Sequence, residues 1–126
     1  MNKLVLDSNV FLRYLLKDIP AQYKEAEVLF RKAKKGKIEL IVPQILIFEI
    51  AFALSKYYSF PKEVVVQKIG SILATDYFQV QDKNIFSDCL PVYMSLNLSL
   101  SDCFIKYFAR GQGIQIFTFD KALRKI

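Results

Sequence analysis

The chain has 126 residues, 53% of them hydrophobic, with a formal net charge of +6 and no histidine. This length fits one domain with a real core and excludes a disordered chain, while the basic charge suits nucleic acid or an acidic protein as a partner. The absence of histidine excludes histidine acid–base chemistry, Ser-His-Asp triads and imidazole zinc sites, and leaves oxygen ligands and hard cations such as Mg²⁺ or Mn²⁺.

The first half of the chain predicts alternating strands and helices. Capping residues, prolines and Gly36 mark the ends of the expected helices. In chain order, we expect a short buried strand at 3–6, a helix through Val10–Leu16 capped by Asp7-Ser8-Asn9, a helix from Pro20 to Gly36, a strand at 38–42, a helix from Pro43 to about Tyr57, and a helix after Pro61 with Val65, Ile69, Ile72 and Leu73 facing inward.

The second half continues the alternation with weaker signals. The periodicity predicts a weak third strand at 77–80, a helix from Asp82 to about Leu96 that Pro91 kinks or breaks, a helix from Leu100 to Arg110 capped by Ser99, a fourth buried strand at 114–118, and a short helix after Asp120. Strands that alternate with helices indicate a parallel sheet covered on both faces.

Other features indicate where the chain acts and how its cysteines behave. No apolar run is long enough for a membrane span without a charge, and the N-terminus does not resemble a signal peptide, so we expect a cytosolic protein. Cys89 and Cys103 lack CxxC spacing, and we expect them to be reduced core residues. We expect Tyr57 and Tyr58 to pack rather than to stack on bases.

Four acidic residues carry the functional hypothesis. Asp7 and Asp120 follow apolar runs predicted as strands, at the carboxyl ends where parallel sheets bind ligands. Glu49 lies about two turns into the helix after the second strand, and Asp102 lies in the first turn of the helix before the fourth. Carboxylates in apolar surroundings are costly unless compensated, and a bound divalent metal would serve all four. We therefore predict a hydrolytic metal site.

Each carboxylate also has a structural explanation. Asp7 and Asp120 can cap the helices that follow them, and Asp102 fits the third position of a capping box that begins at Ser99. Glu49 is hardest to explain in this way, because its helical neighbours Ile45, Leu46, Phe52 and Ala53 are all apolar.

Four segments together resemble the motifs of the PIN-domain family. They are Leu6-Asp7-Ser8-Asn9-Val10-Phe11-Leu12, the isolated Glu49, Leu98-Ser99-Leu100-Ser101-Asp102-Cys103-Phe104-Ile105, and Phe117-Thr118-Phe119-Asp120-Lys121-Ala122-Leu123. Their order covers nearly the whole chain, and the short length is similar to that of VapC-type toxins. Cys103 stands where a small alanine is more usual, a departure that does not touch the carboxylates.

The resemblance implies one PIN-like nuclease domain over residues 1–126. Its expected fold is a three-layer α/β/α sandwich with a central parallel sheet of four to five strands. The implied activity is a Mg²⁺- or Mn²⁺-dependent ribonuclease that cuts single-stranded or looped RNA, with Asp7, Glu49, Asp102 and Asp120 holding the metal and Asn9 and Thr118 orienting them. It also implies a homodimer and a cognate antitoxin.

Several alternatives remain open. A PIN nuclease of RNA processing would need no antitoxin, and a degenerate PIN-like interaction module would use the carboxylates only as helix caps. A phosphatase of the haloacid-dehalogenase type also begins with an aspartate after the first strand. That chemistry needs a second aspartate two residues after Asp7, where this chain has Asn9, and it ranks lower.

Overall fold

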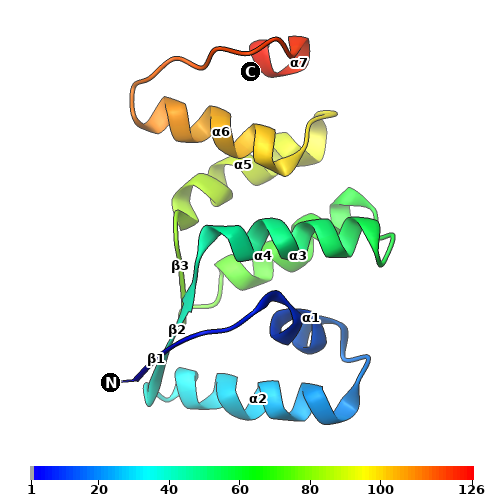
Figure 1. Cartoon of the computed structure of the whole chain (residues 1–126), viewed down its shortest axis with the longest axis vertical. Helices are drawn as coiled ribbons and strands as arrows, with labels where there is room; N and C mark the ends of the chain where they lie inside the picture. Colours follow the sequence, from blue (N-terminus) through cyan, green and yellow to red (C-terminus); the bar gives the residue numbers. More distant parts are fainter. Residues whose placement is uncertain (1) are drawn as a thin grey trace. The chain divides into compact units, whose positions relative to one another are not determined.

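The computed structural model describes residues 2–126, which divide into two compact units. The first unit is Met1–Gln81 and holds every strand described, and the second is Asp82–Ile126 and is helical. In Figure 1 the first unit runs from blue to green and the second from yellow-green to red.

The first unit is built on a parallel sheet with the strand order β1-β2-β3. Leu4 of β1 lies opposite Leu40 of β2, which lies opposite Phe78 of β3. The elements are β1 (Asn2–Val5), α1 (Ser8–Leu16), α2 (Pro20–Lys34), β2 (Ile38–Val42), α3 (Gln44–Lys56), α4 (Lys62–Leu73) and β3 (Phe78–Val80). Right-handed connections that step in one direction place their helices on one face of the sheet, and Figure 1 shows α1–α4 on the same side.

The core of this unit lies between the sheet and those helices. Phe30 packs its ring 5.7 Å from that of Phe11 and 5.1 Å from that of Phe78, which joins α1, α2 and β3. The inward faces of α3 and α4 supply fully buried aliphatic side chains such as Leu54 and Ile69. The core therefore holds α1 and α3 in place. Asp7 caps α1, and Glu49 lies within α3.

The second unit consists of α5 (Lys83–Ser95), α6 (Leu100–Gly111) and α7 (Lys121–Arg124). Phe86 of α5 packs against Phe104 of α6 with 4.9 Å between ring centroids, and α5 continues through Pro91. Cys89 and Cys103 are buried and carry reduced thiols, as the sequence predicts. Burial raises the pKa of the Cys89 thiol to about 12, so this thiol is protonated at neutral pH.

The α/β class with a parallel sheet is confirmed, and the helices and the first three strands match their predicted ranges closely. The sheet described has three strands rather than four to five, and 114–118 is not a strand. A strand needs a partner, and within residues 2–126 this segment pairs with none, so Ile114 is 60% and Phe117 84% exposed.

The prediction that the first strand is buried is also wrong. Among the described residues β1 pairs only with β2, so it lies at the edge of the sheet, with Leu4 and Val5 exposed.

No helix in the described part of the chain is long and apolar enough to cross a membrane.

Candidate active site

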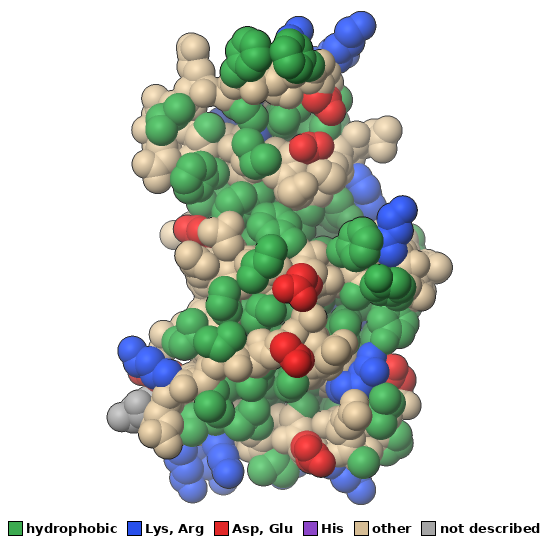
Figure 2. Space-filling model, in the orientation of Figure 1, with side chains coloured by type: hydrophobic (Ala, Val, Ile, Leu, Met, Phe, Trp, Pro, Cys, Tyr) green, Lys and Arg blue, Asp and Glu red, His purple; other side chains and the backbone are tan. Residues whose placement is uncertain are grey.

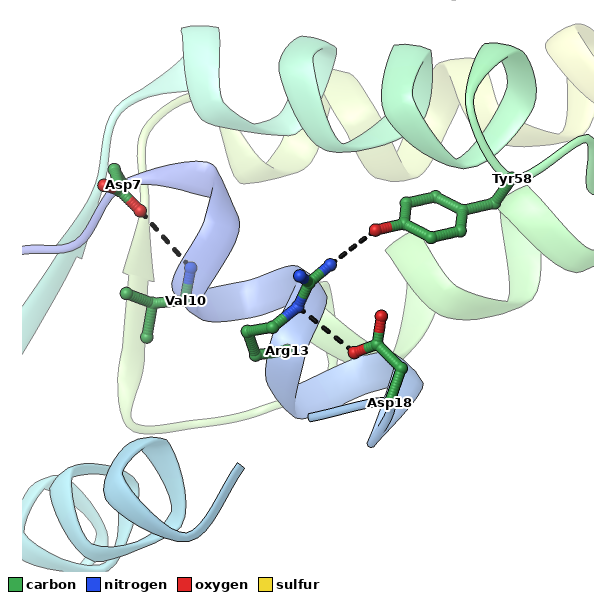
Figure 3. A network of polar contacts seen from close by, with 5 residues as sticks. All are labelled: Asp7, Val10, Arg13, Asp18 and Tyr58. Atoms are coloured by element: carbon green, nitrogen blue, oxygen red, sulfur yellow. Dashed lines mark hydrogen bonds and ion pairs between the residues drawn. The ribbon is translucent and has the colours of Figure 1, made fainter. Parts of the chain in front are cut away.

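Asp7 lies where β1 gives way to α1, and it caps that helix. Its Oδ1 accepts a hydrogen bond of 3.3 Å from the Val10 amide, as Figure 3 shows. The buried side chain of Leu6 anchors the backbone just before it, while the carboxylate of Asp7 is exposed. The capping role expected from the sequence is therefore present. It uses one carboxylate oxygen for the cap, which does not prevent the other from binding a cation.

Glu49 projects from α3 towards the N-terminus of α1. The Ser8 hydroxyl donates a hydrogen bond of 3.3 Å to Glu49 Oε2, across 41 residues of sequence. Because Ser8 follows Asp7 directly, the segments that carry Asp7 and Glu49 lie side by side in the first unit. The sequence topology predicts this neighbourhood, but sequence reasoning did not single out Ser8 as the residue that joins the two segments.

The expectation that the carboxylates are costly because of apolar surroundings is wrong. Asp7, Glu49 and Asp120 are exposed, and Asp102 is half-buried. Helix α3 is apolar nearly all round, with Ile45 and Phe52 exposed on its outer side, so apolar neighbours in sequence do not place Glu49 in the core. Solvation by water accounts for these charges, and burial alone gives no reason for a metal.

In the second unit, both acidic residues lie at helix N-termini. The Asp102 amide donates to the Ser99 hydroxyl at 3.1 Å, which is one half of the predicted capping box. Asp120 accepts from the Leu123 amide at 3.0 Å through Oδ1, and its own amide donates to the Thr118 hydroxyl at 3.0 Å. Thr118 thus bonds to the backbone of Asp120 rather than to its carboxylate.

The donor chemistry of the four carboxylates fits a hard divalent cation. Within residues 2–126, none of the four takes part in an ion pair with lysine or arginine. Carboxylate oxygens are the ligands that Mg²⁺ takes in proteins. The four divide between the units, Asp7 and Glu49 in the first and Asp102 and Asp120 in the second. Among the described residues, no three acidic, cysteine or histidine side chains gather into a metal-binding group.

A polar network beside the first pair joins α1 to the end of α3, and sequence reasoning missed it. Arg13 Nε lies 3.2 Å from Asp18 Oδ1, and the Arg13 guanidinium also donates to the Tyr58 hydroxyl (Figure 3). The Arg13 side chain is only 16% exposed, and it bridges residues 45 apart in sequence. The network therefore holds Tyr58 in place beside α1.

Two grooves flank α1, one on each side. The groove between α1 and α2 has a volume of about 350 Å³ and is lined by Asp7, Asn9, Val10, Arg13, Gln22, Glu25, Ala26 and Leu29. The groove between α1 and α3 has a volume of about 340 Å³ and is lined by Ser8, Asn9, Leu12, Glu49, Phe52, Ala53, Tyr57 and Tyr58. Each groove thus contains a carboxylate predicted to bind metal, and Asn9 lines both.

Comparison with known proteins decides the family. The PIN-domain family model matches residues 4–126. The chain belongs to the PIN-domain family. This PIN domain is also 23% identical over 123 residues to a VapC ribonuclease of Aquifex aeolicus (strain VF5), a match that spans 97% of this chain and 90% of the relative. No solved structure matches it.

Family membership confirms the resemblance seen in the sequence motifs. The matched range includes all four acidic residues of this PIN domain, together with Ser8, Asn9 and Thr118. The match covers both compact units, so the family assignment does not depend on either one alone.

Proposed function

We propose that this PIN domain is a divalent-metal-dependent endoribonuclease that hydrolyses phosphodiester bonds in single-stranded or looped RNA. The observation that carries the proposal is the Ser8–Glu49 hydrogen bond, which places Glu49 beside the Asp7 segment with both carboxylates exposed to solvent. Family membership and the name of the Aquifex aeolicus relative, a VapC ribonuclease, support the same activity.

In this proposal Asp7, Glu49, Asp102 and Asp120 together hold Mg²⁺ or Mn²⁺. When bound, such a cation lowers the pKa of a water molecule and stabilises charge on the transferring phosphate. Ser8 orients the Glu49 carboxylate, Asn9 supports Asp7, and Thr118 supports Asp120 by accepting from its backbone amide.

The charged side chains of this protein act on the phosphate backbone of RNA in two opposite ways. Without a cation the exposed carboxylates repel a phosphate backbone, while the excess of lysine and arginine, a net charge of +6, attracts it. Single-stranded or looped RNA leaves its phosphates accessible. Because the chain has no histidine to activate the 2′-hydroxyl, we expect products with 5′-phosphate and 3′-hydroxyl ends.

The test is cleavage of a labelled single-stranded RNA by the purified chain with Mg²⁺ or Mn²⁺, and with EDTA. Asp7→Asn and Asp120→Asn are informative variants because asparagine caps helices about as well as aspartate, so each change removes a charge and keeps the cap. Asp76→Asn, at an exposed turn, is the matched control for the loss of one negative charge. We expect cleavage that needs metal, is lost in both site variants and persists in Asp76→Asn.

We further propose that the protein acts in the cytosol as a homodimer and as the toxin of a toxin–antitoxin pair. The groove between α1 and α2 supports a protein partner, because Asp7 and Glu25 there would accept an arginine from an inserted segment. A small open reading frame directly upstream, whose product forms a complex with this chain, would support the pair. A solitary gene would favour RNA processing instead.

An interaction module without catalysis is the second candidate, and one observation favours it. Asp7 and Asp120 both serve as helix caps. This alternative predicts that Mn²⁺ does not bind in isothermal titration and that Asp7→Asn leaves partner binding unchanged. Metal-dependent cleavage that Asp7→Asn abolishes would exclude it.

A further inference from the structure

One face of α3 carries an acidic, an aromatic and a basic side chain in succession. Glu49, Phe52 and Lys56 follow one another at spacings of three and four residues, which places them on the same side of a helix. At 1.5 Å of rise per residue, Lys56 lies about 10 Å along the helix axis from Glu49. Both Glu49 and Lys56 are exposed, so this face presents both charges to solvent.

Phe52 and Tyr57 present large aromatic surfaces to solvent beside Glu49. Phe52 is 55% and Tyr57 77% exposed, so the expectation that Tyr57 is packed is wrong, whereas Tyr58 packs against Phe60 as expected. Their rings meet edge to face, with centroids 6.0 Å apart and an interplanar angle of 84°. This contact covers the edge of one ring and one face of the other, and leaves the remaining faces open to solvent. Figure 2 shows hydrophobic side chains beside acidic ones on the surface of the first unit.

Tyr58 closes the far side of the groove between α1 and α3, and it is held rigidly. Its hydroxyl accepts from Arg13, which is itself paired with Asp18, and its ring stacks on Phe60 with centroids 6.3 Å apart. The groove therefore has a fixed wall, an aromatic rim and the Glu49 carboxylate at one end. A preorganised aromatic site of this kind binds a flat ligand without a large ordering cost.

We propose that this groove binds one unpaired nucleobase of the RNA, stacked on the ring of Tyr57 with the ring of Phe52 against its edge. Lys56 contacts a phosphate on one side of that nucleotide, and the phosphate on the other side lies towards Glu49, one of the carboxylates that would hold the metal. The inference rests on the proposed function, because it takes the groove as part of the path of the substrate.

The lining of the groove favours a base over a segment of protein. Its volume of about 340 Å³ lies in the range of small-ligand pockets. Three hydroxyls, from Ser8, Tyr57 and Tyr58, and the Glu49 carboxylate line it, which gives hydrogen-bonding groups for the edge of a base. Base stacking on exposed aromatic rings is tolerant of sequence, which suits a single-stranded substrate.

The test measures RNA binding to the full chain in EDTA, where cleavage cannot occur under the proposed function. The probe is a short single-stranded RNA that carries one 2-aminopurine, whose fluorescence falls when it stacks on an aromatic ring. Tyr57→Phe keeps a stacking surface, while Tyr57→Leu and Phe52→Leu remove one, and all three lie at exposed positions that do not contribute to the core. Tyr107→Leu, at a half-buried tyrosine in α6 of the second unit, is the control for the loss of an aromatic ring away from the groove.

We expect the 2-aminopurine signal to fall on binding to the wild-type chain, Tyr57→Phe and Tyr107→Leu. We expect Tyr57→Leu and Phe52→Leu to weaken binding by about five- to a hundredfold and to reduce the quenching. Lys56→Gln should weaken binding and make it less sensitive to salt.

Two outcomes separate this inference from the proposed function. Metal-dependent cleavage with an unchanged KM in Tyr57→Leu and Phe52→Leu would overturn the base site and leave the nuclease intact. Binding that depends on Tyr57, with no cleavage in the presence of any metal, would support the base site and contradict the proposed nuclease activity. Loss of a protein partner in these variants, with RNA affinity unchanged, would assign the groove to that partner and overturn the inference.

Discussion

The Ser8 hydroxyl and Glu49 Oε2 lie 3.3 Å apart, although 41 residues separate them in sequence. Ser8 belongs to the first turn of α1, which Asp7 caps, and Glu49 lies in the middle of α3. One hydrogen bond therefore joins the start of one helix to the exposed side of another, and it relates two carboxylates that the sequence places far apart.

Ser8→Ala should weaken both metal binding and RNA cleavage. The variant loses the donor that orients Glu49, and because this hydrogen bond is long and exposed we expect a loss of about tenfold, at the lower end for such supporting residues. Isothermal titration with Mn²⁺ and cleavage rates measure the effect. Ser8→Thr keeps a hydroxyl and should recover most of the activity.

The control for Ser8 is Ser71→Ala, since the Ser71 hydroxyl bonds only to the backbone of its own helix, at the Lys68 carbonyl. Equal losses in Ser71→Ala and Ser8→Ala would show that the effect is a general loss of a surface hydroxyl. That result would contradict an orienting role for Ser8.

Tyr58→Phe should destabilise the first unit by about 0.5–1.5 kcal/mol, the usual contribution of one hydrogen bond. The change removes the acceptor for the Arg13 guanidinium and leaves the ring in place. Arg13→Met should cost more, because it also leaves Asp18 without its partner. Urea unfolding of both single variants and the double variant gives their coupling energy, and strictly additive losses would mean that the two residues do not cooperate.

Ser99→Ala should lower the stability of the second unit by about 1 kcal/mol, a typical cost for losing an N-cap. The Ser99 hydroxyl accepts from the Asp102 amide at 3.1 Å, and alanine cannot accept. Thermal unfolding followed by circular dichroism measures the loss, and Ser99→Thr should restore much of it. An unchanged melting temperature in the alanine variant would show that the cap contributes little.

The stability of the protein should fall as pH rises above about 9, with a contribution from Cys89. Burial raises the pKa of this thiol from its ordinary value of 9.0 to about 12, so the folded state retains a proton that the unfolded state loses between these two values. Fewer protons on the unfolded chain mean that unfolding becomes easier as pH increases through this window. Urea midpoints between pH 8 and 11 should therefore decline less steeply for Cys89→Ala than for the wild type.

Lysines and tyrosines also titrate in that range, so the difference between the two slopes isolates Cys89. Alkylation gives an independent check. Because Cys89 is fully buried and stays protonated, iodoacetamide at pH 8 should leave it unmodified in the folded protein and label it in urea. Rapid labelling of the folded chain at Cys89 would show that the thiol is accessible and that the raised pKa does not hold.

Local sequence signals predicted the elements well where the glycines and prolines that end them agree with the pattern of apolar residues. Residues 38–42 form β2 as predicted, because a mostly apolar segment lies between Gly36 and Pro43. The helix faces that carry buried residues also follow their periodicity, as Ile69 and Ile72 show in α4. Pairing is a property of two segments, which explains why 114–118 has the composition of a strand and is not one in the structure.

The candidate site is harder to predict because it depends on long-range contacts. Parallel topology was enough to place Asp7 and Glu49 near each other. No pattern marks Arg13 as the partner of Tyr58, since that contact depends on how the α1–α2 and α3–α4 connections are shaped. The exposure of Glu49 could not be predicted from the sequence either, because α3 has apolar residues on both its buried and its exposed sides.

The open side of β1 bears on how the protein behaves at high concentration. A row of free backbone amides and carbonyls on an edge strand is a template for another chain, and the apolar side chains of Leu4 and Val5 add to that tendency. The strand is only four residues long, and Lys3 places an exposed charge within it. We therefore expect Lys3 to oppose edge-to-edge aggregation, and Lys3→Val should lower the solubility of the chain without altering the proposed catalytic residues.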